Sequence, residues 1–147
     1  MTAEAQTVVF LHGIGADPDS WNAQIDALPA GFAGIAPTIA GLADADDQEF
    51  SLTTAAAVVR DEIDRRGIRR AHLCGLSLGA MVATRFAIDY PERVASLVLS
   101  GSQVHPSHAL MKVQNAILRL LPARLVSLPG MSKQRMLAVL RAVGQTD

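Results

Sequence analysis

The stretch HLCGLSLGA, residues 72–80, places one serine between glycines in otherwise apolar surroundings. Ser77 follows Gly75 by two residues and precedes Gly79 by two, so the segment fits the pattern G-x-S-x-G. The run before the serine is typical of a buried strand, and the small residues after it are typical of a helix. A turn tight enough to project the hydroxyl from a sheet brings neighbouring backbones close together. The two flanking positions therefore have to lack bulk.

The chain of 147 residues alternates between predicted strands and helices. Short apolar runs predict strands at residues 7–11, 31–37, 71–75 and 94–100. Helices are predicted after Ser20 and Ser51, which can act as N-caps, and again from residue 78. Residues 38–50 hold four acids among Gly and Ala and predict a solvated loop. This alternation predicts an α/β fold with a mostly parallel sheet flanked by helices on both faces.

From residue 103 onward the pattern changes to helices without strands. Apolar side chains recur on one helical face over residues 110–121, and a second helix is expected over 132–143. This part holds six Lys or Arg and one acid, whereas residues 1–102 hold seven Lys or Arg and thirteen acids. A basic amphipathic helix can meet an anionic membrane, but scattered basic residues favour a helical segment whose charges face water and the acidic body. The expected division is a core over residues 1–102 and a helical segment over 103–147.

Composition argues against several functional classes. A formal net charge of −1 and an aromatic content of 4% disfavour nucleic acid as a partner. A single cysteine, Cys74, and the acid in the N-terminal MTAEAQ lead us to expect a cytoplasmic protein without a disulfide. The sequence has no apolar run of roughly 18 residues, so stable membrane insertion is not expected.

Cofactor motifs are also missing from the sequence. HGIGADP has Pro18 where a dinucleotide-binding motif needs its third glycine, and GK[ST] does not occur. The histidine spacing offers no metal site. No cofactor and no metal are therefore expected.

From Thr7 to Gly101 the sequence resembles the α/β-hydrolase family. FLHGIG at residues 10–15 is similar to that family's turn after the first central strand, and YPERVASLVLSG at 90–101 is similar to its connection to the next strand. The resemblance implies that Ser77 is the nucleophile. It also implies that the backbone N–H groups of Ile14 and Leu78 form the oxyanion hole.

The resemblance assigns supporting roles to neighbouring residues. Gly13, Gly75 and Gly79 would shape the two turns, and His12 would orient its loop and not act as the base. Trp21 matches a common family position, where core packing is the favoured role and substrate contact an alternative. Cys74 is interpreted as a small hydrophobe. His72 is interpreted as a surface or strand-edge histidine.

The sequence offers no well-placed partner for the serine. A serine hydroxyl needs a base to take its proton and an acid to orient that base, in the chain order Ser, Asp or Glu, His. The acids and histidines that follow it are Asp89, Glu92, His105, His108 and Asp147. The first two acids belong to the far end of the helix after the serine, and the last follows both histidines. His105 lies just past the fourth strand and could reach Ser77, but a surface loop is the favoured interpretation.

The resemblance implies that the sequence stops within the family's helical cap, before the strands that carry the acid and the histidine. We therefore expect a partial α/β-hydrolase fold with an open sheet edge. The leading hypothesis is a serine hydrolase of small ester, lactone or related acyl substrates that forms an acyl-Ser77 intermediate, with weak or no turnover for this chain alone. The alternatives are a non-catalytic small-molecule binding or interaction protein, and a homo-oligomer joined through the open edge.

Overall fold

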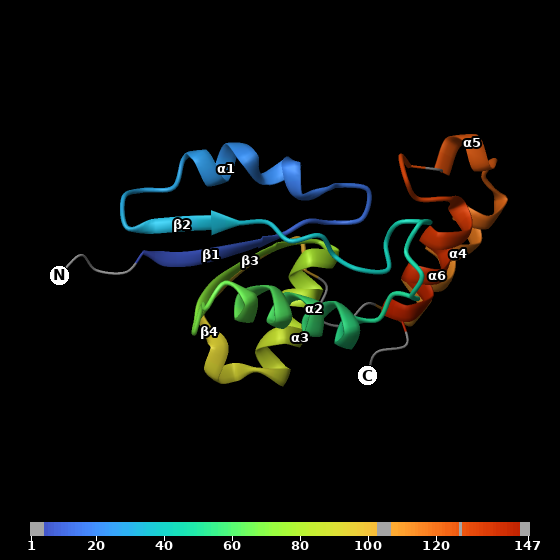
Figure 1. Ribbon diagram of the computed structural model, residues 1–147. Coiled ribbons are helices and arrows are strands. Elements are labelled where there is room, and N and C mark those ends of the chain that lie inside the picture. The colour runs from blue at the N-terminus through green and yellow to red at the C-terminus, as the bar shows by residue number, and fades with distance from the viewer. Residues whose placement is uncertain (1–4, 103–106, 127, 145–147) are drawn as a thin grey trace.

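The computed structural model describes residues 5–102, 107–126 and 128–144 (Figure 1). Its strands form one parallel sheet in the order β2-β1-β3-β4. The strands are β1 (Gln6–Leu11), β2 (Phe32–Ile35), β3 (Ala71–Leu76) and β4 (Val94–Ser100). The helices are η1 (Pro18–Trp21), α1 (Asn22–Asp26), α2 (Leu52–Arg65), α3 (Leu78–Asp89), η2 (Pro91–Arg93), α4 (His108–Leu120), α5 (Ala123–Val126) and α6 (Lys133–Val143). The predicted fold class is confirmed.

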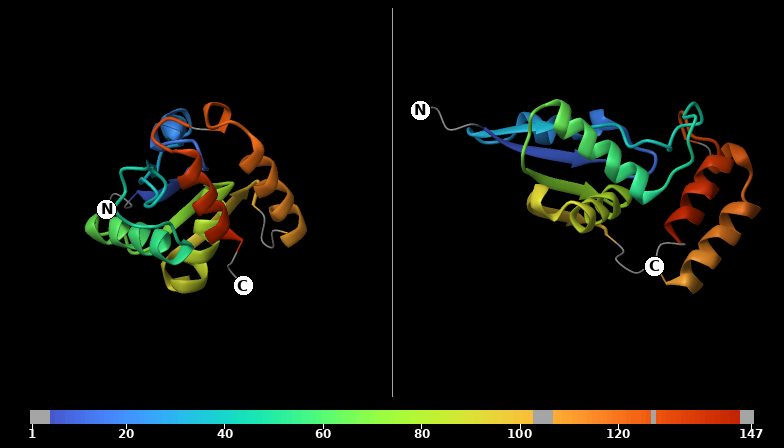
Figure 2. Two further views of the ribbon diagram at one scale, coloured as in Figure 1. Left: turned by 90° about the vertical axis from the view of Figure 1, so that its right-hand side faces the viewer. Right: turned by 60° about the horizontal axis from the view of Figure 1, so that its bottom comes forward.

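Helices lie on both faces of the sheet, as expected (Figures 1 and 2). Side chains alternate across a strand, and the buried Val9 and Leu11 of β1 join the same apolar cluster as the inner residues of α2 and α3. Phe10 points to the opposite face, where its ring lies 5.0 Å from that of Trp21 in η1. Trp21 is half-buried and packs against Phe10, outside the main apolar cluster.

The second predicted helix is confirmed with its cap. Ser51 accepts a hydrogen bond from the Thr54 backbone N–H at 3.0 Å, which satisfies one of the free donors at the start of α2. The predicted apolar stripe is buried and includes Leu52, Ala55, Val59 and Ile63. Gly67, with φ of +69°, follows the helix where a left-handed residue is needed.

The first predicted helix needs correction. The capping residue is Asp17 and not Ser20: the Asp17 carboxylate accepts from the Ser20 backbone N–H at 3.2 Å, and Pro18 opens the 3-10 turn η1. The α-helix that follows spans only Asn22–Asp26. An aspartate followed by proline is itself a signal for a helix start, and it comes before Ser20 in the sequence.

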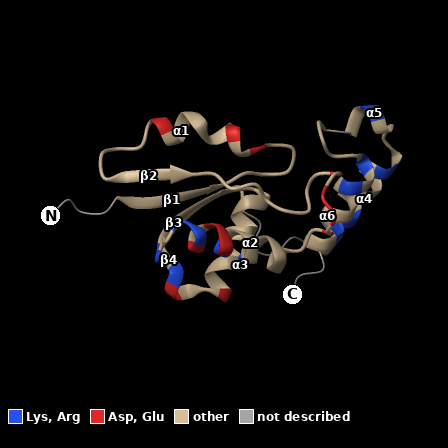
Figure 3. Cartoon of the chain, viewed as in Figure 1, with Lys and Arg blue, Asp and Glu red and all other residues tan. Residues whose placement is uncertain are grey.

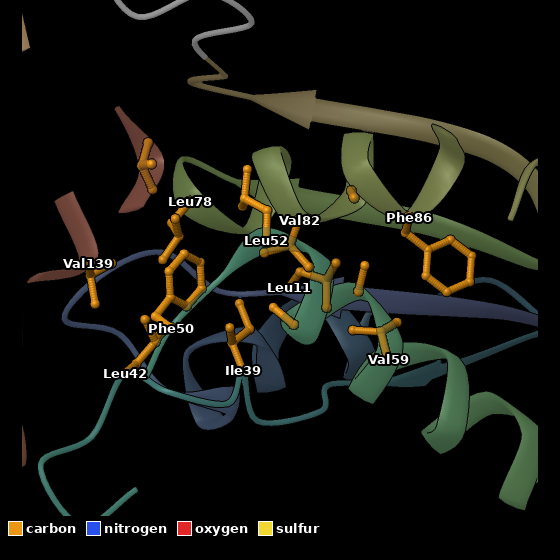
Figure 4. Close-up of a cluster of buried hydrophobic side chains, with 14 of the residues drawn as sticks. Leu11, Ile39, Leu42, Phe50, Leu52, Val59, Leu78, Val82, Phe86 and Val139 are labelled. Atoms are coloured by element: carbon orange, nitrogen blue, oxygen red, sulfur yellow. The ribbon is translucent and has the colours of Figure 1, made fainter. Parts of the chain in front are cut away.

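The C-terminal helices split into two groups. Val139 of α6 joins the main core together with Phe50 and Leu42 from the loop before α2, as Figure 4 shows. In contrast, Val113 and Ile117 of α4, which were expected to share an apolar face, are each more than half exposed. Because α6 shares the core of the sheet, the division at residue 102 stays a prediction.

Within the described residues the sheet ends at β4, and both faces of this strand are accessible. Leu97, Val98 and Leu99 are 38%, 57% and 39% exposed. An edge strand with unpaired backbone groups and apolar side chains is a template for pairing with another chain. The open edge expected from the sequence is therefore present in this part of the chain.

We predict that Val98→Lys lowers self-association of the chain. A lysine on an edge strand disfavours edge-to-edge pairing because its charge would be buried at the contact. Light scattering over a concentration series should give a smaller mean mass for the variant than for the wild type, with Lys112→Ala on α4 as a matched surface control. A wild type that stays monomeric throughout would contradict the prediction.

Candidate active site

Ser77 occupies the sharp turn between β3 and α3. It is the N-cap residue of α3 and the only non-glycine residue of the described segments with a positive φ, at φ 53° and ψ −115°. Such a conformation costs on the order of 1–3 kcal/mol and persists only where the surroundings enforce it. The residue is exposed, although the strand before it and the helix after it are largely buried. A polar side chain is thus presented to solvent by a rigid, strained turn.

Hydrogen bonds hold the turn on both sides. The Ser77 backbone N–H donates to the carbonyl of Ser100, at the end of β4, over 2.8 Å. The Ser77 carbonyl accepts from the N–H groups of Ala80 and Met81 at 3.0 and 3.2 Å, which starts the hydrogen-bonding pattern of α3. The neighbouring strand and the following helix therefore hold Ser77 in its strained conformation.

The two glycines of the motif lie where backbones nearly touch. A Cβ on Gly79 would lie 2.0 Å from the Leu11 carbonyl oxygen, and a Cβ on Gly75 would lie 2.5 Å from the Gly79 carbonyl oxygen. Neither contact can be relieved by a side-chain rotation, because both involve main-chain atoms. Only glycine at these positions lets α3 begin directly above β1 and β3.

The turn after β1 lies against the serine. A Cβ on Gly13 would lie 3.4 Å from the Ser77 Cβ and 3.3 Å from the Leu76 carbonyl oxygen. His12 is buried at 3% exposure, its Nε2 accepts from the Ile39 N–H at 3.5 Å, and its Nδ1 lies 3.0 Å from the Gly13 carbonyl oxygen. This pair of contacts fits a neutral imidazole with its proton on Nδ1. His12 is therefore engaged in its own loop.

Two backbone amides in the turns that meet at Ser77 donate no hydrogen bond within the described residues. Leu78 is the first residue of α3, so its N–H has no acceptor within the helix and lies at the positive end of the helix dipole. In the described part of the chain, the Ile14 N–H donates no hydrogen bond either. The structure thus brings together the two turns on which the sequence interpretation placed an oxyanion hole.

The other candidate residues lie elsewhere. His72 lies within β3, an inner strand, so of the two interpretations the strand edge is wrong. Its side chain is half-buried, and its ring nitrogens contact Gln6 and Ser96, each at 2.8 Å, in hydrogen bonds that are exposed to solvent. Cys74 is half-buried on the same strand, and this burial raises the pKa of its thiol. A thiol with a raised pKa holds little thiolate at neutral pH and is a poor nucleophile.

No base or acid partners the serine within residues 5–102, 107–126 and 128–144. The described side chains include neither an imidazole nor a carboxylate that contacts the Ser77 hydroxyl. Asp89 pairs with Arg85 at the far end of α3, as the sequence indicated. Glu92, which was expected at the end of the same helix, lies in the following 3-10 turn η2. His105 and Asp147 fall outside the described residues, as does the side chain of His108.

Two neighbours of the site were not singled out from the sequence. The hydroxyl of Ser102 is buried and has no hydrogen-bond partner among the described residues. Ser102 lies just past Ser100, whose carbonyl accepts from Ser77 in the sharp turn between β3 and α3, which we call the elbow. Leu128, which precedes α6, lies against the turn after β1, where a Cβ on Gly15 would come within 2.4 Å of its Cδ1. Local spacing cannot reveal the second contact, because its two residues are far apart in the chain.

The described residues contain neither a metal-binding cluster nor a membrane-spanning helix. Among the described residues, no group of three or more His, Cys, Asp or Glu side chains is placed to hold a metal ion. None of the helices in these segments is both long and apolar enough to cross a bilayer.

Comparison with known proteins identifies the family. The sequence profile of the alpha/beta hydrolase fold matches residues 6–142, and the chain belongs to this family. It is 35% identical over 106 residues to a 2-hydroxy-6-oxo-6-phenylhexa-2,4-dienoate hydrolase of Comamonas testosteroni, covering 67% of this chain and 37% of that protein. It is 36% identical over 97 residues to the dihydrolipoyllysine-residue acetyltransferase component of the acetoin cleaving system of Cupriavidus necator, covering 65% of this chain and 26% of the relative.

Solved structures agree on the fold. The enol-lactonase of Burkholderia xenovorans superposes with a TM-score of 0.80 at 16% identity, over 97% of this chain and 66% of the other. At this identity the match establishes the fold alone. The chain thus matches about a quarter to somewhat over a third of the length of these curated relatives, and about two thirds of the enol-lactonase.

We predict that Gly79→Ala destabilises the protein by at least about 3 kcal/mol, because its Cβ would overlap the Leu11 carbonyl and only a backbone shift could relieve the contact. Urea unfolding followed by circular dichroism measures the change. Gly67→Ala is the control: its Cβ would meet no atom within 4 Å, so only the cost of the positive φ remains, about 1–2 kcal/mol. Equal losses in the two variants would contradict the close approach at Gly79.

We also predict that Ser77→Gly is more stable than Ser77→Ala by about 1 kcal/mol. Glycine adopts the observed φ and ψ without a Cβ penalty, whereas alanine keeps the strain of the native turn. The gain is reduced by the greater chain entropy of glycine in the unfolded state. Chemical denaturation of the two variants provides the comparison, and an alanine variant at least as stable as the glycine variant would argue against strain at this residue.

Proposed function

We propose that this chain carries the nucleophile and the oxyanion hole of a serine hydrolase that acts on small esters, lactones or related acyl substrates. Ser77 is the nucleophile, and the N–H groups of Ile14 and Leu78 are the oxyanion donors. We also propose a cytoplasmic location, because Cys74 is the single cysteine of the sequence and has no partner for an internal disulfide. The observation that carries the proposal is the exposed hydroxyl on a strained strand–helix turn, packed against a second turn whose backbone amide is free.

The chemistry follows from this arrangement. The Ser77 Oγ attacks the substrate carbonyl carbon while a base takes the hydroxyl proton, and the carbonyl oxygen becomes an oxyanion. The two amides donate to that oxygen where its charge develops, and removing one such donor typically costs on the order of 10²-fold or more in rate. The carbon–oxygen bond to the leaving group then breaks, the leaving oxygen takes up a proton, and water releases the acid from acyl-Ser77.

Family members support hydrolysis as the reaction class. The dienoate hydrolases among the relatives share at least 33% identity with this chain, and an enol-lactonase shares its fold. Their substrates contain carbonyl groups, in agreement with a site built around an oxyanion hole. The base and the acid have no counterpart in the described segments, so we expect weak or no turnover for this chain alone.

The proposal predicts a single fluorophosphonate adduct on Ser77. The Ser77 oxygen displaces fluoride from phosphorus, and the two amides stabilise the charge on the phosphoryl oxygen. Labelling should be slow, because no base contacts the hydroxyl in the part of the chain described. Intact-mass spectrometry with peptide mapping measures both the extent and the position of the adduct.

Two variants make the labelling experiment specific. Ser77→Ala should remove the adduct, whereas Ser20→Ala, which alters another exposed serine, should leave it unchanged. An unlabelled but folded wild type, or an adduct that persists in Ser77→Ala, would contradict an activated Ser77.

The second candidate is a binding protein that keeps the site without the chemistry. It is favoured by one observation: the described residues provide no base for Ser77. An unlabelled wild type that nevertheless binds a small ester, as measured by ligand-observed NMR, would support this alternative over the hydrolase.

A further inference from the structure

Hydrogen bonds join the C-terminal segment, residues 128–144, to the acidic loop between β2 and α2, residues 38–50. The Asp44 carboxylate accepts from the backbone N–H of Ser132 at 2.7 Å and from its hydroxyl at 2.8 Å, and the Asp44 N–H donates to the Gly130 carbonyl at 2.8 Å. Ser132 is also the N-cap of α6, so a carboxylate from a distant loop reinforces the positive end of this helix. We call the contacts of Asp44, Ser132 and Arg135 between these segments the latch.

Arg135 forms the second half of the latch. Its guanidinium donates to the carbonyl oxygens of Asp46, Gln48 and Asp44 at 2.8, 3.2 and 3.4 Å. Within the same loop, the Asp46 carboxylate accepts hydrogen bonds from the Gly41 and Ala43 N–H groups at 2.7 and 3.1 Å, which stabilise the conformation of the loop. Arginine suits this position because its planar fork can serve several acceptors at once.

The latched segments both reach the turn after β1. In the loop, the Ile39 N–H donates to His12 Nε2, and His12 in turn contacts the Gly13 carbonyl. From the C-terminal segment, the Leu128 side chain lies against Gly15. A cavity of about 260 Å³ lies between them and is lined by His12, Gly15, Ile39 and Met131 among others. The turn that carries Ile14 is thus contacted from two sides by the segments that the latch joins.

The two segments also carry charges of opposite sign. Figure 3 shows acidic positions in the loop beside basic positions on α6, the two sides that the latch connects. Arg135 contacts this loop through main-chain carbonyl oxygens, and the Asp44 carboxylate binds the N–H and hydroxyl of Ser132. The contacts between the two segments are therefore hydrogen bonds in which each charged group meets a neutral partner.

We infer that Asp44 and Arg135 are positioning residues for the oxyanion turn, acting through residues 39–48 and through Leu128. The inference rests on the proposed function for its catalytic meaning, whereas the coupling itself is a property of the fold. Opening the latch releases both supports of the Gly13–Gly15 turn while leaving β1, β3 and α3 in place. The direction of the Ile14 N–H therefore changes before the conformation of the turn at Ser77 does.

The test compares Arg135→Ala and Asp44→Ala with the wild type in the full 147-residue chain. Hydrogen exchange should become roughly tenfold faster in the peptide that spans residues 11–16, as expected when a local opening costs less free energy. Fluorophosphonate labelling of Ser77 should slow several-fold. Arg135→Lys, which keeps the charge but loses the fork, should fall between Arg135→Ala and the wild type.

Arg141→Ala is the matched control, since Arg141 lies on α6 and is exposed. It should leave both readouts unchanged. If Arg135→Ala fails to fold by circular dichroism, Arg135→Lys and Asp44→Asn provide the same comparison. Unchanged exchange at residues 11–16 in the folded latch variants, or an equal increase in Arg141→Ala, would overturn the inference. Faster exchange together with an unlabelled wild type would support the latch and contradict the proposed function.

Discussion

The close approach of main-chain atoms at the start of α3 is the constraint on which the rest of the structure depends. Gly79 lies directly on the Leu11 carbonyl, and Gly75 lies under the first turn of the helix. Because no side chain separates them, α3 starts at the carboxyl ends of β1 and β3 and not beside them. The same approach sets the position of Ser77 and brings the turn after β1 against it. One steric requirement therefore fixes the packing of the sheet and the location of the candidate site.

Much of this could be predicted from the sequence, because the decisive signals are local. The spacing of Gly75, Ser77 and Gly79 predicted the elbow, and the cap at Ser51 with its apolar stripe predicted α2. The observed strand Val94–Ser100 coincides with the predicted one, because a short apolar run after Pro91 can form few structures other than a strand. At the first helix the prediction missed the 3-10 turn η1, because Asp17 and Pro18 start this turn ahead of Ser20. That error concerns a helix boundary, which is the least certain feature of a sequence prediction.

The remaining features depend on contacts between segments far apart in the chain. Leu128 against Gly15 and Arg135 on the carbonyls of the acidic loop join residues separated by more than eighty positions, and no periodicity encodes such pairs. The exposed apolar face of α4 could not be foreseen either, because a hydrophobic stripe predicts a buried surface without saying what covers it. Only the charge difference between the two parts of the chain indicated where the C-terminal segment would lie.

The elbow also links the site to the open edge of the sheet. The strained conformation of Ser77 is held on one side by the Ser100 carbonyl, the last residue of β4, and β4 is the exposed edge strand. A strand that pairs on only one side has fewer hydrogen bonds resisting local opening than an inner strand has. Any chain that pairs with β4 therefore stabilises the acceptor that fixes the Ser77 backbone. We therefore expect coverage of the edge to make the Ser77 turn more rigid, even though Val98 and Ser77 belong to different elements.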